Sequence, residues 1–266
     1  MTHGASQPTL DGAQGPPPAD GPDTLNLFEA AILLAFIRAT EVRAPTTPSH
    51  TLTQSLARWL EQRGIIEVCP DDDMGPGGPP ARAIYDPLSW RYSWGSVRVA
   101  DLEGPVRARV QALSSERGNT ETRAVLWRLL ASAELEGYFA NRLRKHGFDG
   151  RWADAVFVSH DPWRSERICL AQARYAAWAA VREGASAYLR FDGDEEGTRS
   201  AILGEFQRRL DWVEARPDWG TGFVPAEGGL QSVLLGIFLS DVARLGSKYW
   251  TLPPNARMLR SAEGGA

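Results

Sequence analysis

Residues 119–147 read NTETRAVLWRLLASAELEGYFANRLRKHG, and this stretch predicts one long helix in the middle of the chain. Its apolar side chains recur mostly every three or four residues, the spacing that gathers them on one helix face. They are Val125, Leu126, Leu129, Leu130, Ala133, Tyr138, Phe139 and Leu143. Asn119 is a residue type that caps helix N-termini, and Gly147 is the type that most often ends a helix. We therefore expect a fold that is mostly α-helical.

On either side of this helix, composition and predicted elements divide the chain into three regions. Residues 1–23 are rich in proline and glycine and hold no aromatic residue, so we predict a disordered tail. Residues 24–104 are predicted to form an N-terminal α+β subdomain. Residues 105–266, beginning after Gly104, are predicted to form a mainly helical C-terminal domain. The expected fold class is accordingly mostly α, with an α+β portion.

The N-terminal subdomain is expected to contain two helices followed by short strands. The first helix runs from Thr24 to about Thr40 and carries apolar residues around most of its circumference, which predicts a buried helix. The second begins at Thr51 or Thr53 and ends at Gly64. Ile65–Val68 and parts of residues 83–100 are rich in β-branched and aromatic residues, which favours short strands.

The C-terminal domain is predicted to hold a short strand–helix–strand element among its helices. Ala155–Ser159 and Ala187–Phe191 are apolar runs of strand length, and a helix from Ser165 to Glu183 separates them. This spacing suits a right-handed crossover between parallel strands. Further helices are expected from Thr198 to about Ala215 and from Leu230 to Leu245, the last one apolar nearly all round.

Charge and cysteine content exclude several classes of protein. The 266 residues include 29 basic and 33 acidic side chains, a net charge of -4, so no global positive field attracts nucleic acid or anionic lipid. Cys69 and Cys169 have the spacing of neither a disulfide framework nor a zinc site. The apolar run Leu230–Leu239 is too short to span a bilayer, and the first 24 residues lack a secretory signal. We expect a cytoplasmic protein that makes no membrane contact and binds no metal or cofactor.

A candidate catalytic site follows from the predicted strand–helix–strand element. Ligands of open parallel sheets bind beyond the carboxyl ends of the strands, where polar residues occur here. They are Ser159, His160, Asp161 and Arg164 after the first strand and Asp192 and Asp194 after the second. On neighbouring strands these groups could act as acid and base in a hydrolytic or nucleotide-processing reaction. The alternative is structural: Asp161 caps a turn, and the acidic stretch favours the dipole of the following helix.

Aromatic residues supply a candidate binding site of a different kind. Trp59, Trp127, Trp178 and Trp212 fall on apolar helix stripes, so we assign them to the core. Trp163, Trp219 and Phe223 fall in predicted loops, where large rings are harder to bury and can mark a protein interface. The alternative for Trp219 and Phe223 is that they fold back as a lid over the helices.

One stretch of the N-terminal subdomain resembles part of a winged-helix domain. Leu56–Val68 reads LARWLEQRGIIEV, which is similar to the end of a recognition helix leading into the first wing strand. This resemblance implies a DNA-binding regulator that uses Thr53–Arg63. Between Leu25 and Leu113, however, nine arginines stand against ten acidic residues, so no basic face is visible for phosphate contacts.

A second stretch, Ala155–His160, reads AVFVSH and resembles the opening strand of TIR domains, which is an apolar run ending in Ser-His. The resemblance covers about six residues and implies that these residues form a strand.

The sequence supports three functional hypotheses. The leading one is a non-enzymatic protein-interaction or regulatory module that binds an unknown protein partner through Trp219, Phe223 and Trp163. The second is an enzyme with the site at the predicted strand ends. The third is a winged-helix-like DNA-binding regulator, although the charge balance does not favour nucleic acid as a partner.

Overall fold

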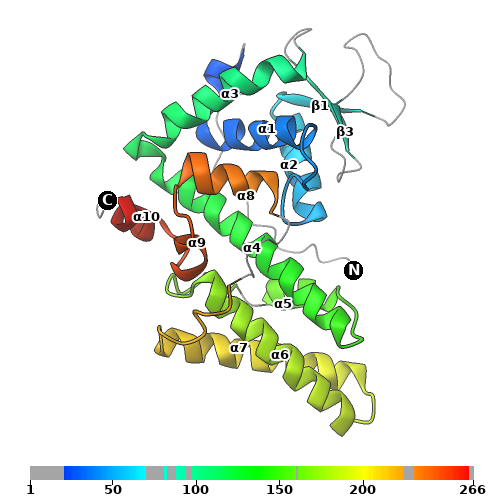
Figure 1. The fold of residues 1–266 in the computed structure, drawn as a ribbon. Helices are drawn as coiled ribbons and strands as arrows, with labels where there is room; N and C mark the ends of the chain where they lie inside the picture. Colours follow the sequence, from blue (N-terminus) through cyan, green and yellow to red (C-terminus); the bar gives the residue numbers. More distant parts are fainter. Residues whose placement is uncertain are drawn as a thin grey trace. The chain divides into compact units, whose positions relative to one another are not determined.

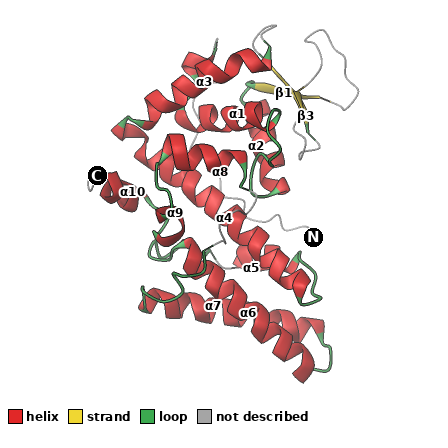
Figure 2. Cartoon of the chain, in the orientation of Figure 1, coloured by secondary structure: helices red, strands yellow, loops and turns green. Residues whose placement is uncertain are grey.

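A computed structural model describes residues 21–69, 81–82, 88–93, 98–159, 161–224 and 231–263 of the chain (Figure 1). These residues are mostly helical and include one small antiparallel sheet, which confirms the expected mostly α class (Figure 2). Residues 1–20 of the predicted tail lie outside the described residues. Within the described parts, the helices are too short or too polar to cross a membrane.

The described residues group into two compact units. What we call the α1–α3 unit comprises the described residues within 21–130, 231–246 and 259–263, and the α6–α7 unit comprises those within 131–224 and 247–258. The division falls inside helix α4, Thr120–Lys145. The bounds of α4 confirm the long helix predicted from the sequence. Helix α3, Val99–Ser114, runs through Pro105 without interruption.

Helix α1 forms the centre of the α1–α3 unit. Every residue of α1 except Arg38 is buried, and the helix packs against α3 and α8. Its N-cap is Asn26, and the buried carboxylate of Glu29 accepts hydrogen bonds from the Asn26 amide and from Arg63 Nε, each 2.9 Å long. The remaining elements of this unit are η2 (Pro22–Thr24), α2 (His50–Gln62), η3 (Arg117–Asn119), α8 (Val233–Ile237) and the π-helical η4 (Phe238–Val242).

The sheet lies in the same unit and has the strand order β1–β3–β2. Its strands are β1 (Ile66–Cys69), β2 (Ala81–Arg82) and β3 (Ser89–Tyr92), and both pairings are antiparallel. Val68 lies opposite Trp90, whose buried ring meets the edge of Phe36 from α1 at 6.0 Å. The strand predicted at Ile65–Val68 is thereby confirmed with a shift of one residue.

The α6–α7 unit is built on a pair of antiparallel helices (Figure 1). Helix α6 (Leu170–Arg190) turns at residues 191–193 into α7 (Glu195–Ala215). A Cβ placed on Gly184 would overlap the Ile202 side chain, so the two helices approach closely at that point. Phe139 of α4 contacts Phe206 of α7 with ring centroids 5.4 Å apart. The other elements are α5 (Trp152–Ser159), α9 (Lys248–Thr251) and the start of α10 (Ala256–Glu263).

The predicted strand–helix–strand element is wrong, because both apolar runs are helical. Ala155–Ser159 belongs to α5, and residues 187–190 form the last turn of α6. An apolar run of five residues fits a buried helix turn as well as a strand, since periodicity cannot separate the two at that length. In α5 the apolar residues serve helix packing: the Phe157 ring lies 6.3 Å from Phe139 and 6.2 Å from Phe206. The strand implied by the TIR resemblance is wrong for the same reason.

Candidate binding surface

The premise of the predicted catalytic site is lost, because no strands bring its members to one sheet edge. Ser159 is the last residue of α5, and His160 lies outside the described residues. Among the described members, no hydrogen bond or ion pair joins Asp161 or Arg164 to Asp192 or Asp194. The part of the chain that the structure describes also holds no group of three or more candidate metal ligands. A catalytic role for these residues stays a prediction.

Two of the acidic members have structural contacts of the kind that the alternative interpretation expects. Asp161 Oδ1 accepts a hydrogen bond from the Trp163 amide at 2.9 Å and so stabilises the turn after α5. Asp194 is the N-cap of α7, and its carboxylate accepts from the amides of Glu196 and Gly197. Asp192 occupies the left-handed backbone region with φ of 51°, within the turn that joins α6 to α7.

Trp163 belongs to the interior and not to an exposed loop tip. Its side chain is 7% exposed, and the indole Nε1 donates a hydrogen bond of 2.8 Å to Ser132 Oγ on α4. A buried indole satisfied in this way is a packing residue. The interface role predicted for Trp163 therefore finds no exposed surface to act through.

The loop after α7 behaves differently, because its two aromatic residues cover the α6–α7 pair and still face solvent. The Trp219 ring meets the edge of Trp212 at 4.4 Å, and the Phe223 ring meets Tyr175 at 5.2 Å and Trp178 at 5.4 Å. Trp219 nevertheless remains 52% exposed. The predicted fold-back of the loop and the predicted exposure of Trp219 thus occur together.

Three arginines stack on the rings of this region. The guanidinium of Arg182 lies 4.7 Å from the Trp178 ring, and that of Arg216 lies 4.8 Å from the Trp212 ring. Arg209 lies between Tyr175 and Trp212 at about 6 Å from each ring. We call the whole set the aromatic–arginine surface, and it comprises Tyr175, Trp178, Arg182, Arg209, Trp212, Arg216, Trp219 and Phe223.

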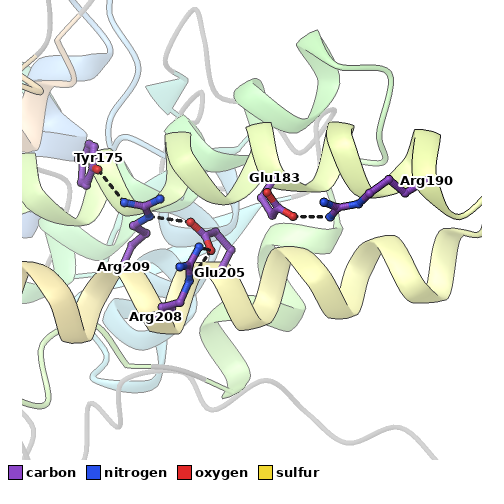
Figure 3. Close-up of polar contacts among 6 residues, drawn as sticks. All are labelled: Tyr175, Glu183, Arg190, Glu205, Arg208 and Arg209. Atoms are coloured by element: carbon purple, nitrogen blue, oxygen red, sulfur yellow. Dashed lines mark hydrogen bonds and ion pairs between the residues drawn. The ribbon is translucent and has the colours of Figure 1, made fainter.

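The arginines of this surface differ in their charge partners. Arg209 Nε donates to Glu205 Oε1 at 2.6 Å, and Arg209 Nη1 donates to the Tyr175 hydroxyl at 3.2 Å (Figure 3). The hydrogen bond to Glu205 raises the pKa of Arg209 above its ordinary value. The single charge of Glu205 is shared with Arg208, so it holds Arg209 in place without cancelling both guanidinium charges. Arg182 and Arg216 have no carboxylate partner among the described residues.

Backbone contacts fix the loop that carries Trp219. The buried Gln172 side chain accepts a hydrogen bond from the Cys169 amide and donates one of 2.8 Å to the Pro217 carbonyl. Gly220 adopts a φ of 75°, and a Cβ there would lie 3.1 Å from Tyr175 Cβ. Only glycine combines that backbone conformation with so close an approach. The position of the loop is thus set from both sides, by a buried amide and by a glycine.

A second group of polar residues lies inside the α6–α7 unit. The Arg174 guanidinium lies 4.3 Å from the Tyr138 ring and 5.5 Å from the Trp250 ring. Burial raises the pKa of Glu134, and the nearby charge of Arg174 opposes that rise. Burial also raises the pKa of Glu136, and the charge of Asp154 adds to the effect. Glu134 and Glu136 are both half-buried among the packed helices.

Sequence reasoning named Trp219 and Phe223 but missed most of the surface around them. Trp178 and Trp212 were predicted as core, yet both are only half-buried and form the floor under Arg182 and Arg216. The signal is present in the sequence: Trp178 precedes Arg182 by four residues on α6, and Trp212 on α7 precedes Arg216, the C-cap of that helix, by four residues. Side chains at that spacing stack along one helix face.

Comparison with known proteins does not assign this chain to a family. It matches no protein-family model, no curated protein and no solved structure. The functional argument consequently rests on the geometry of the surface itself.

Proposed function

We propose that this protein is a protein-binding module whose contact surface is the aromatic–arginine surface. Tryptophan, tyrosine and arginine are the residue types that carry most binding energy at protein interfaces, and all three gather here. The supporting observation is the half-exposed Trp219 ring, packed against Trp212 beside the unneutralised guanidinium of Arg216. A partner could bury apolar surface against the central ring, and the flanking cations would orient it by pairing with its carboxylates.

The network under the surface favours binding over a purely structural role. Glu205 fixes Arg209, and Arg209 in turn holds the Tyr175 hydroxyl, so the aromatic floor is ordered before any partner arrives (Figure 3). Preorganised side chains lose less conformational entropy on association. Above this ordered floor Trp219 remains 52% exposed, which leaves ring surface for a partner to bury.

Site-specific photo-crosslinking in the native host tests the proposal. A benzoylphenylalanine in place of Trp219 is expected to crosslink a defined protein, and the crosslink is expected to disappear when Arg216→Ala is added. The same photoreactive residue in place of Arg151, which is exposed in the turn before α5, is the control and should not crosslink that protein. Equal crosslinking from both positions, or none from Trp219, would refute the proposal. A circular dichroism melt of each variant verifies that the fold is retained.

DNA binding is a second candidate, favoured by one observation. Helix α2 leads directly into β1 of an antiparallel sheet, the order that the winged-helix resemblance implies for residues 56–68. Binding through phosphates weakens steeply as salt rises. Failure of the protein to be retained on double-stranded DNA at low salt would eliminate this candidate.

A further inference from the structure

The turn between α6 and α7 is both apolar and acidic. Leu189 is 82% exposed and Phe191 is 47% exposed. Four exposed carboxylates follow within five residues, and none of them forms an ion pair with a described residue. They belong to Asp192, Asp194, Glu195 and Glu196. We call residues 189–196 the acidic turn. Arg190, the one cation in it, is paired with Glu183 (Figure 3).

The acidic turn and the aromatic–arginine surface are complementary in two respects. One offers exposed apolar side chains beside the carboxylates of Asp192, Glu195 and Glu196, since that of Asp194 caps α7. The other offers exposed rings beside the cations Arg182 and Arg216. Opposite potentials on two surfaces steer their encounter and set the register of the contact. Leu189 and Phe191 also leave apolar area in water that a partner can bury.

Within one molecule the acidic turn cannot reach the outer end of that surface. Glu196 and Arg216 lie at opposite ends of α7, and 20 residues of helix rise about 30 Å. Figure 3 shows the same separation, with Arg209 and Tyr175 toward one end of the helix pair and Arg190 toward the other. A contact between the acidic turn and Arg216 must therefore join two copies.

We infer that the acidic turn of one copy binds the aromatic–arginine surface of a second copy. This inference rests on the proposed function, because it names the partner of the same surface. Leu189 and Phe191 would cover the Trp219 ring, and the carboxylates that follow would pair with Arg182 and Arg216. Such a contact is head-to-tail: it leaves the surface free on one copy and the turn free on the other, so the assembly closes as a ring or extends.

Sedimentation equilibrium of the full chain tests the inference. The wild-type protein is expected to show a weight-average mass that rises above 29.2 kDa with concentration and falls back as salt increases. Arg216→Glu is expected to weaken association at least tenfold, and so is the double variant Glu195→Gln/Glu196→Gln. Arg257→Glu, an exposed arginine on α10, is the matched control and should associate like the wild type.

Mixing the two weakened variants gives the decisive readout. Arg216→Glu keeps its acidic turn, and Glu195→Gln/Glu196→Gln keeps its surface, so together they should form a 1:1 heterodimer that grows no further. A wild type that stays at 29.2 kDa up to about 200 µM, or two variants that do not combine, would overturn the inference. A monomeric wild type that still crosslinks another protein from position 219 would retain the proposed function and remove only the second copy as its partner.

Discussion

The guanidinium of Arg216 lies 4.8 Å from the ring of Trp212, which precedes Arg216 by four residues. Arg182 repeats the arrangement on α6, at 4.7 Å from the Trp178 ring. Stacking occupies the face of each guanidinium and leaves its edge, where the N–H donors lie, open to an incoming carboxylate. The rings of Trp178 and Trp212 thus hold the guanidiniums of Arg182 and Arg216 in place.

Replacing Trp163 and Trp219 separately by alanine should distinguish a core ring from a surface ring. Trp163→Ala removes a buried ring and its hydrogen bond to Ser132, so the free energy of unfolding should fall by about 3–5 kcal/mol. Trp219→Ala removes a ring that is already half in water, so a loss of about 1 kcal/mol is expected. Urea unfolding monitored by circular dichroism measures both. Equal losses would show that Trp219 is a core residue.

Gly220 should tolerate no side chain. Gly220→Ala forces alanine into a φ of 75° and brings its Cβ to 3.1 Å from Tyr175 Cβ. We expect a loss of about 1–3 kcal/mol, together with increased mobility of the Trp219 ring, measured from its own resonance in fluorine NMR of the fluorotryptophan-labelled protein. Gly222→Ala is the control in the same loop, because its Cβ meets nothing within 4 Å, and it should leave both measurements unchanged. Similar effects of the two substitutions would contradict this account of the loop.

Replacing two glycines on the paired helices by alanine should change the stability of the protein in opposite directions. Gly184→Ala would overlap the buried Ile202 side chain, so overpacking should cost about 1–3 kcal/mol. Gly204 on α7 has open space around its Cβ position, so Gly204→Ala should stabilise the helix by up to about 1 kcal/mol. Melting temperatures of the two variants provide the comparison. A stabilising Gly184→Ala would mean that the helices are not closely packed there.

Gly184 also shows why part of the fold could be predicted and part could not. Helices α1 and α4 were recognisable because an apolar pattern is a local feature, although α1 is capped by Asn26 and does not begin at Thr24. Helix α6 was expected to stop at Glu183, just before Gly184, yet it continues to Arg190. That glycine is present because Ile202 packs against it, and a contact between residues 18 positions apart leaves no local trace. The false strand at Ala187–Phe191 followed from ending the helix too early.

The candidate surface was predictable only in part for a related reason. Trp219 and Phe223 stood out because large rings are hard to bury in a loop and can therefore mark an interface. The half-burial of Trp178 depends on Phe223 and Arg182, which reach it from a distant loop and from the next helical turn. The catalytic hypothesis failed in its premise because the strand ends it needed are helix ends, where Asp194 caps α7.

Glu136 should make the stability of the protein depend on pH in a defined direction. Burial, and next the charge of Asp154, raise its pKa above the ordinary value of 4.5, so the folded protein binds this proton more tightly than the unfolded chain. Stability from this group is fully present below pH 4.5 and is lost as pH rises through the raised pKa. Glu136→Gln removes the ionisation. At pH 7 the variant should therefore be more stable than the wild type by a fraction of a kcal/mol, about 0.2–1 kcal/mol for a partly exposed charge.

The difference between the Glu136→Gln variant and the wild type should shrink toward zero as pH falls to 4. Thermal melts of both proteins at pH 4, 5, 6 and 7 measure it. Asp149→Asn is the control, because its carboxylate is exposed and its pKa is lowered by the hydrogen bond from Arg151, so its effect should have the opposite sign. Removing the charge of Glu136 removes the cost of burying that charge and its repulsion by Asp154, and both changes stabilise the protein. A Glu136→Gln variant less stable than the wild type at pH 7 would therefore show that the carboxylate has a stabilising partner.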